Sequence, residues 1–261
     1  MNQPIVIIGI GELGGIFAKA FLHAGYAVYP VTRKMDIDQA ANDMPDPQLV
    51  LVAVAEKDFS AVMQALPAPW RRCIGLLQNE LLPRDWQSYP IDDPTIVSVW
   101  FEKKKGMDTN VLIPSRVYGP QGSLIAGALH GVDIACNVLS TEDDLLYELV
   151  RKNVFVFTIN IAGLVLPEGT TTETLWAQHH ELALAIADEV IDVQQWLTGA
   201  TFDRIRLIDG LIEGLNGDLQ HKCKGRSARG RLERLSAVAD EAGLKIPRIT
   251  EIKDTPGEAL P

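Results

Sequence analysis

The chain has 261 residues, of which 47% are hydrophobic and 22% are charged, which suits a globular protein of one large or two modest domains. Its formal net charge of −10 at pH 7 argues against general binding to nucleic acids or to anionic membranes. The longest apolar run, residues 154–166, is too short to span a bilayer and contains Thr158 and Asn160, so it predicts a buried helix.

The sequence opens directly on a predicted strand, without the basic and apolar regions of a signal peptide. The three cysteines are far apart and odd in number, which suits a reduced protein better than a disulfide framework or a zinc site. We therefore expect a cytoplasmic protein without a bound metal.

Apolar segments alternate with helical segments through the first half of the chain. Residues 4–8 are β-rich and apolar on both faces, as a central parallel strand is, and the helix that follows is ended by Gly25. Further elements are predicted as strands at 26–31, 49–54, 73–77 and 95–101 and as a helix around 57–66. Pro30 indicates that the second strand lies at an edge of the sheet or that the strand ends there. The alternation predicts βαβ crossovers and an N-terminal Rossmann-type, doubly wound α/β sheet over residues 1–139.

The pattern becomes helical near residue 140. The stretch STEDDLLYELVRKNVF begins with a good N-cap and has acids in its first turn. Helices are predicted at 142–166, 172–198, 201–221 and 227–243, the last of them closed by Gly243 and Pro247. We therefore predict an all-helical C-terminal domain over residues 140–261.

Three glycines stand between the first strand and the first helix. Gly9, Gly11 and Gly14 form the pattern G-x-G-x-x-G, in which the first glycine makes a tight turn, the second lets a pyrophosphate approach and the third allows close packing of helix on strand. The pyrophosphate would bind at the helix N-terminus, where Glu12 and Leu13 lie. The alternative is that these are turn glycines of an α/β protein that binds no nucleotide, but their place in a βαβ unit favours a cofactor.

The end of the second strand indicates which dinucleotide is bound. An NAD site carries Asp or Glu there, whereas this chain has Thr32, Arg33 and Lys34, a hydroxyl and two cations that suit a 2′-phosphate. A charge-assisted hydrogen bond contributes roughly 1.5–3 kcal/mol, so one good arginine contact would favour NADP(H) about ten- to a hundred-fold. The alternative is that both cations are solvated loop charges.

Three later stretches, together with the glycine motif and its basic strand end, resemble one family in order and spacing. They are LLQNEL (76–81), STEDDLLYELVRKNVFVFTINIAGLV (140–165) and GRSARGRLERLSAVADEAGLKIP (225–247). They are similar to the Gln-Asn-Gly motif, the Trp-Arg-Lys helix and the last long helix of the ketopantoate reductase (2-dehydropantoate 2-reductase) family. The resemblance covers nearly the whole chain and implies hydride transfer from NADPH to the carbonyl of a 2-keto acid, a small anionic substrate.

The resemblance also assigns roles to individual residues. Lys152 falls on the family's catalytic lysine, whose ammonium can stabilise and protonate the developing oxyanion. Asn160, about two helical turns further on, falls on a substrate-side asparagine, and Asn79 on the motif asparagine near the nicotinamide ribose. The alternatives are a surface lysine, an amide satisfied inside the helical core and an ordinary loop residue, respectively.

Four positions depart from the family's pattern. Val156 replaces a second asparagine, Glu80 replaces the motif glycine, and Arg229 stands where the family has an active-site glutamate. The family's substrate-carboxylate serine falls at about Glu213 or Gly214. Each lost polar contact weakens substrate binding by about 1–3 kcal/mol, which argues against ketopantoate itself as the substrate. Arg229 becomes a candidate substrate-binding residue for a different anion.

Around Arg229 the chain is unusually basic, with cations at Lys222, Lys224, Arg226, Arg229, Arg231 and Arg234. This stretch is either a solvated helix face or interdomain contact, or a site for an anionic substrate or for the cofactor phosphates. Two consecutive histidines, His179 and His180, have no Asp, Glu or His at metal-ligand spacing, and we interpret them as structural.

The sequence thus favours an NADP(H)-dependent oxidoreductase that acts on a small anionic carbonyl compound. One rival is a non-catalytic NADP-binding sensor that has lost its substrate residues, and another is a reductase of imines or a related substrate on the same scaffold. A homodimer formed through the helical domain is a further candidate arrangement.

Overall fold

The computed structural model describes residues 2–103, 106 and 108–255. The chain divides into two compact units, Met1–Leu149 and Val150–Pro261. The division falls inside the helix α6 (Glu142–Ala162), whereas the sequence places the start of the second domain at residue 140, just before this helix. About two turns of α6 therefore belong to the first unit and the remaining turns to the second.

The first unit is built on a sheet of seven strands in the order β2-β1-β3-β4-β5-β8-β9. The strands are β1 (Ile5–Ile8), β2 (Val28–Val31), β3 (Leu49–Val52), β4 (Ile74–Leu76), β5 (Thr95–Ser98), β8 (Ser115–Tyr118) and β9 (Cys136–Val138). The first five strands are parallel, β8 runs antiparallel to β5, and β9 runs parallel to β8. A separate antiparallel pair is formed by β6 (Phe101–Glu102) and β7 (Asn110–Val111).

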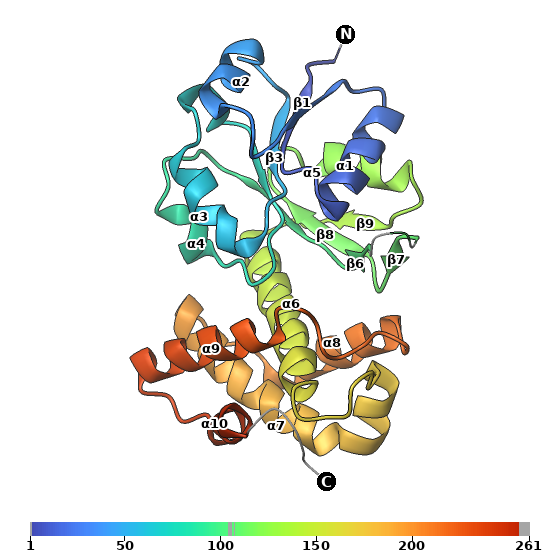
Figure 1. The fold of residues 1–261 in the computed structure, drawn as a ribbon, viewed down its shortest axis with the longest axis vertical. Helices are drawn as coiled ribbons and strands as arrows, with labels where there is room; N and C mark the ends of the chain where they lie inside the picture. The colour runs from blue at the N-terminus through green and yellow to red at the C-terminus, as the bar shows by residue number, and fades with distance from the viewer. Residues whose placement is uncertain (1, 104–105, 107, 256–261) are drawn as a thin grey trace. The chain divides into compact units, whose positions relative to one another are not determined.

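Helices cover both faces of this sheet. They are α1 (Glu12–His23), α2 (Ile37–Asp43), α3 (Glu56–Gln64), α4 (Pro83–Gln87) and α5 (Gly122–His130), with a short 3₁₀ helix at Ala68–Trp70. Figure 1 shows α1 and α5 on one face and α2, α3 and α4 on the other. Because both faces are covered, every residue of β1 and β3 is buried, and Phe17 of α1 and Leu129 of α5 join the core on their side.

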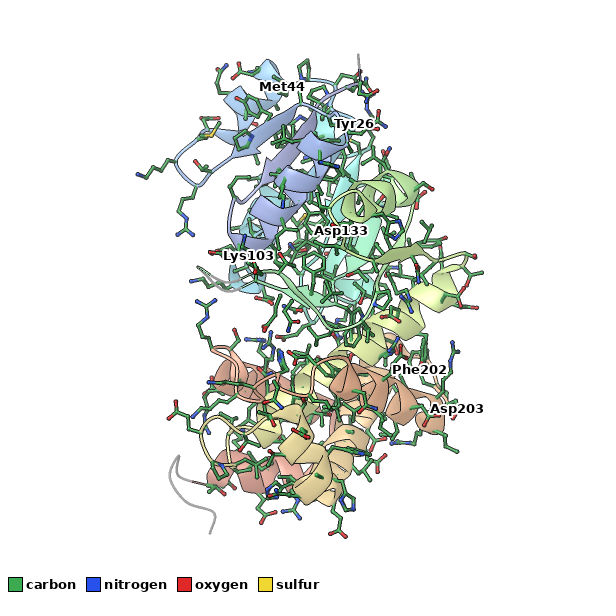
Figure 2. All side chains as sticks on the ribbon, turned by 90° about the vertical axis from the view of Figure 1, so that its right-hand side faces the viewer. Tyr26, Met44, Lys103, Asp133, Phe202 and Asp203 are labelled. Atoms are coloured by element: carbon green, nitrogen blue, oxygen red, sulfur yellow. The ribbon has the colours of Figure 1, made fainter. Side chains whose placement is uncertain are left out.

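The second unit is helical. Besides most of α6 it contains α7 (Thr172–Thr198), α8 (Arg204–Gly217), α9 (Ala228–Ala242) and α10 (Pro247–Asp254). The long helix α7 contacts α8, α9 and α10. Local capping fixes where α8 begins: the side chain of Asp203, labelled in Figure 2, accepts hydrogen bonds from the backbone N–H groups of Ile205 and Arg206.

The predicted fold class, a doubly wound α/β sheet followed by helices, is confirmed. Pro30 lies in β2, which is an edge strand, as the proline indicates. Other details differ from the prediction, two of them in the helical half. Helix α6 ends at Ala162, before residue 166. Pro247 begins α10, where a missing N–H is no loss, and the carboxylate of Glu189 accepts from the N–H groups of Arg248 and Ile249 at 2.7 and 2.9 Å.

Among the described residues, none of the helices combines the length and the apolar composition that a membrane crossing requires.

Candidate functional site

The loop between β1 and α1 requires glycine at two positions of the G-x-G-x-x-G pattern. Gly9 has a φ of +97°, and a Cβ there would lie 2.8 Å from the carbonyl oxygen of Ala53, at the end of β3. A Cβ on Gly14 would lie only 2.0 Å from the carbonyl oxygen of Gly9. Gly9 therefore makes the turn and Gly14 permits the close packing of α1 on this loop.

Gly11 has a different environment. It is the N-cap of α1, and a Cβ built on it would have no described atom within 4 Å. Glycine has no side chain that could cap the first turn, so no side chain accepts from the N–H groups that begin with Glu12 and Leu13. A helix N-terminus without a cap attracts an anion. The exposed carboxylate of Glu12 repels an anion there, so a phosphate would have to be held by the backbone N–H groups and not by this side chain.

The glycine loop lies where the strand order reverses. Ile8, the last residue of β1, is aligned with Val31 of β2 on one side and with Val52 of β3 on the other. The three carboxyl ends therefore reach the same edge of the sheet, and the chain leaves β1 for one neighbour before crossing to the other. In open α/β sheets, ligands bind outside the carboxyl ends of the strands at such a switch point.

The turn after β2 displays the candidate ribose-phosphate residues at this same edge. Thr32, Arg33 and Lys34 are exposed, and the turn is closed by a 3.0 Å hydrogen bond from the N–H of Met35 to the carbonyl of Thr32. The nearest acid, Asp36, was not singled out from the sequence. Its Oδ1 caps α2 by accepting from two backbone N–H groups at 2.9 and 3.0 Å.

The loop after β4 is tied to the loop after β3. The side chain of Gln78 is buried and donates to the carbonyl of Val52 at 2.7 Å. Asn79 is half-buried and its Nδ2 donates to Glu56 Oε1, at the start of α3, at 3.0 Å. The Gln-Asn pair therefore fixes this loop against the edge of the sheet that carries the glycine loop.

Glu80, at the position of the family's motif glycine, has the left-handed φ of +64° that glycine favours. This conformation costs a residue with a side chain roughly 1–2 kcal/mol, part of which the greater freedom of glycine in the unfolded chain offsets. We expect Glu80→Gly to raise the free energy of unfolding, by up to about 1 kcal/mol, in urea denaturation. Glu168→Gly, at an exposed turn residue outside the left-handed region, should lower it; a loss at both positions would contradict the strain at Glu80.

Lys152 lies on a segment of α6 that is firmly anchored on either side of it. Its neighbour Arg151 is buried, with Nη2 2.9 Å from Glu213 Oε2 of α8. Asn153 is also buried and donates to Gln194 Oε1 of α7 at 2.8 Å. These two contacts hold the backbone at Lys152 in place. Lys152 itself is half-buried, so its side chain lies at a partly exposed surface of the helix.

Asn160 is only 5% exposed, and both polar atoms of its amide have partners inside the second unit. Its Oδ1 accepts from Arg231 Nη1 at 2.8 Å, and its Nδ2 donates to the carbonyl of Cys223 at 3.3 Å. This geometry agrees with the alternative of an amide satisfied inside the helical core. Arg231 is itself buried, and Val156, one turn earlier on α6, adds only apolar surface.

Arg229 is separated from Asn160 by the orientation of α9. Arg231 turns inward to Asn160, whereas Arg229 is exposed, with Nε 3.4 Å from Glu233 Oε1. Its Nη2 donates to the carbonyl of Lys253, near the end of α10, at 3.4 Å. Among the described contacts, Asn160 and Arg229 are thus not brought into one binding group.

The remaining reactive side chains offer little covalent chemistry. All three cysteines are free thiols, and burial raises the pKa of Cys73 and Cys223 to about 11 and that of Cys136 to about 12. They stay protonated near neutral pH, which makes them poor nucleophiles. Within the described part of the chain, no three His, Cys, Asp or Glu side chains are grouped so that they could hold a metal ion.

Comparison with known proteins shows the fold but no sequence family. No protein-family model matches the chain, and no curated protein matches it either. A probable 2-dehydropantoate 2-reductase from Bacillus subtilis has a TM-score of 0.69 at 14% identity, with 96% of this chain and 97% of that chain covered. A 2-dehydropantoate 2-reductase from Geobacter metallireducens GS-15 has a TM-score of 0.67 at 16% identity, with 96% and 97% covered.

A third solved structure, D-mandelate dehydrogenase in complex with NADH, has a TM-score of 0.67 at 13% identity and covers 97% of each chain. The fold of these proteins therefore extends over nearly the whole of this chain, although few residues are identical.

Proposed function

We propose that the protein is an NADP(H)-dependent oxidoreductase that reduces the carbonyl group of a small 2-keto acid. The observation that carries this proposal is the glycine loop at the switch point, where Gly14 must lack a side chain and Gly11 leaves the N-terminus of α1 open. The fold of 2-dehydropantoate 2-reductases over 96% of the chain supports the reaction class.

The residues present fit a dinucleotide phosphate. The N–H groups at the start of α1 would hold the pyrophosphate, Arg33 and Lys34 would bind a 2′-phosphate, and Asn79 would lie near the nicotinamide ribose. When bound, the nicotinamide would supply or accept the hydride. Residues 32–34, at the end of β2, include no acid that would favour NAD, and the next acid along the chain, Asp36, accepts with its Oδ1 from two N–H groups as the cap of α2.

Arg33→Ala should therefore discriminate between the two nicotinamide cofactors. We expect the Kd of NADPH to rise about ten-fold or more, because a charge-assisted hydrogen bond is lost, while the Kd of NADH stays nearly constant. Lys19→Ala, which removes an exposed cation from α1, is the matched control and should change neither value. Fluorescence titration measures both constants, and equal weakening of NADPH and NADH by Arg33→Ala would contradict the assignment.

Lys152 is the proposed acid. Its ammonium would hydrogen-bond to the substrate carbonyl oxygen, stabilise the negative charge that develops there and give it a proton as the new C–H bond forms. The anchored neighbours Arg151 and Asn153 support this role, because they hold the helix that positions the lysine. Asn160 would support the substrate side indirectly, through Arg231 and the loop at Cys223.

The proposal is tested by following NADPH absorbance with a panel of 2-keto acids and, in reverse, 2-hydroxy acids with NADP. We expect turnover with at least one 2-keto acid, and ketopantoate should be a poor substrate because Val156 replaces a polar partner. The engaged amide of Asn160 favours one rival, an NADP-binding sensor. Tight NADPH binding without turnover would establish that rival, and turnover on imines alone would establish an imine reductase.

A further inference from the structure

The second unit contains an open cavity of about 330 Å³ with a strongly basic lining. Three residues with cationic side chains line it: Lys224 from the loop before α9, Arg229 from the first turn of α9 and Lys253 near the end of α10. Leu164 and Ile252 add an apolar wall. The volume is within the range of small-ligand sites, and the concentration of positive charge is unusual in a chain of net charge −10.

The loop that carries Lys224 is held by its backbone. The N–H of Cys223 donates to the carbonyl of Thr170 at 3.0 Å, and Asn160 Nδ2 donates to the carbonyl of Cys223 at 3.3 Å. The turn that follows α6 approaches so closely that a Cβ on Gly163 would lie 2.6 Å from the backbone nitrogen of Lys224. The position of Lys224 is therefore set by a rigid scaffold, as binding sites require.

Arg229 and Lys253 are brought together by a direct contact between α9 and α10. Arg229 Nη2 donates to the carbonyl of Lys253 at 3.4 Å, so the guanidinium lies beside the backbone from which the Lys253 side chain starts. The counter-ion of Arg229 is Glu233, at 3.4 Å, with side chains 54% and 61% exposed. An exposed pair of this kind neutralises little charge, and the guanidinium remains available to a better acceptor.

One carboxylate, Asp254, also lines the cavity. Three cations and one carboxylate leave a formal lining charge of about +2, which a single monoanion would not balance. A phosphate group is dianionic near neutral pH and has three acceptor oxygens, enough to meet two ammonium groups and one guanidinium.

We propose that this cavity binds the phosphate group of a small molecule whose carbon skeleton packs against Leu164 and Ile252. This assigns the basic stretch of the sequence: Lys224 and Arg229 converge on the cavity, and Arg231 is buried against Asn160. Lys222 and Arg226 are exposed outside the lining, as the described residues define it. The site lies within one unit and does not depend on hydride transfer.

The test is calorimetric titration of the full chain with phenyl phosphate, a dianion with an apolar ring, at a constant ionic strength of about 0.15 M, where the Debye length is about 8 Å. Lys224→Ala and Arg229→Ala should each weaken binding about ten-fold or more, because each removes a charge-assisted hydrogen bond. Lys222→Ala and Arg226→Ala change the net charge equally and should leave binding within about two-fold, since their exposed charges act only through a screened field.

Equal weakening by all four variants would show a diffuse electrostatic effect and overturn the site, and so would binding that survives both Lys224→Ala and Arg229→Ala. Thermal unfolding verifies that each variant is folded. If an alanine variant does not fold, Lys224→Gln or Arg229→Gln replaces it, because glutamine keeps much of the aliphatic stem. Benzoate, a monoanion with the same ring, should bind more weakly than phenyl phosphate; equal affinity would remove the phosphate assignment.

The source of the phosphate is distinguished by repeating the titration with saturating NADPH. Displacement that depends on Lys224 and Arg229 would mean that the cavity holds a phosphate of the cofactor, whereas simultaneous binding would mean a separate phosphorylated ligand. The outcome is independent of the proposed reaction, because a protein without turnover on any keto acid would still bind phenyl phosphate here.

Discussion

Gly14→Ala is expected to lower the free energy of unfolding by about 3 kcal/mol or more, because the new methyl group would lie 2.0 Å from the backbone oxygen of Gly9. A backbone atom in a packed loop cannot move aside as the end of a side chain can. Gly15→Ala, one residue further along the same helix, meets no described atom within 4 Å and is the matched control. It should gain about 0.5–1 kcal/mol of helix propensity. Urea denaturation of both variants measures the difference.

Gly11→Ala should separate cofactor binding from folding. Its Cβ has no described atom within 4 Å, so the substitution should cost less than about 1 kcal/mol, the usual effect at an N-cap. The same methyl group would stand in the space through which a pyrophosphate approaches the start of α1. We expect the Kd of NADPH to rise about ten-fold or more while the unfolding curve stays close to that of the native chain.

If Gly11→Ala binds NADPH as tightly as the native chain does, the loop is not the pyrophosphate site and the proposed cofactor binding is wrong. If the free energy of unfolding of Gly14→Ala equals that of the native chain, the close packing of α1 on the loop at this residue is contradicted. The two variants thus test a binding role and a packing role at positions three residues apart.

Lys152→Ala is expected to lower kcat by about 10²- to 10⁴-fold on any 2-keto acid that the protein reduces, because it removes the proposed proton donor. The Kd of NADPH should stay nearly constant. Lys152→Arg keeps the charge but donates a proton poorly at neutral pH, and it should recover only part of the activity. Lys245→Ala, an exposed lysine between α9 and α10, is the control for the lost charge and should be fully active.

Lys152 is half-buried and has contacts of its own, so each variant is also compared by thermal unfolding. A loss of activity that follows a loss of folded protein would indicate a structural lysine. Full turnover by folded Lys152→Ala would remove the residue from the mechanism and leave the sensor as the better description of the protein.

The central strands could be predicted because their signal is local: β1 and β3 are short, apolar on both faces and followed by helices. Helix α5 was missed because Gly122 and Gly127 weaken its propensity and its N-cap, Gln121, forms no side-chain cap. Strands β8 and β9 were missed as well. In β8 only alternate residues are buried, so it lacks a continuous apolar run.

In the candidate site, too, the features that depend on residues close together in the chain could be predicted and those that depend on distant residues could not. The turn at Gly9 and the close packing at Gly14 could be predicted because the pattern that indicates them spans only six residues, whereas the binding role of Gly11 stays a prediction. The partners of Asn160 could not, because Arg231 follows it by 71 positions and is brought to it only by the packing of α9 on the rest of the unit. The left-handed backbone at Glu80 was also unexpected, since the residue type argues against it.

Helix α6 has a consequence for how the two halves of this protein can be exchanged or inherited. A cut at the compact division, between Leu149 and Val150, would open the helix and leave about four N–H and four C=O groups without their partners. A cut before Glu142 would spare them, because there the hydroxyl of Thr141 already caps the chain by accepting from the N–H of Asp144 at 3.1 Å. Recombination between relatives of this fold should therefore preserve α6 whole, with its first turns travelling alongside the helices of the second unit.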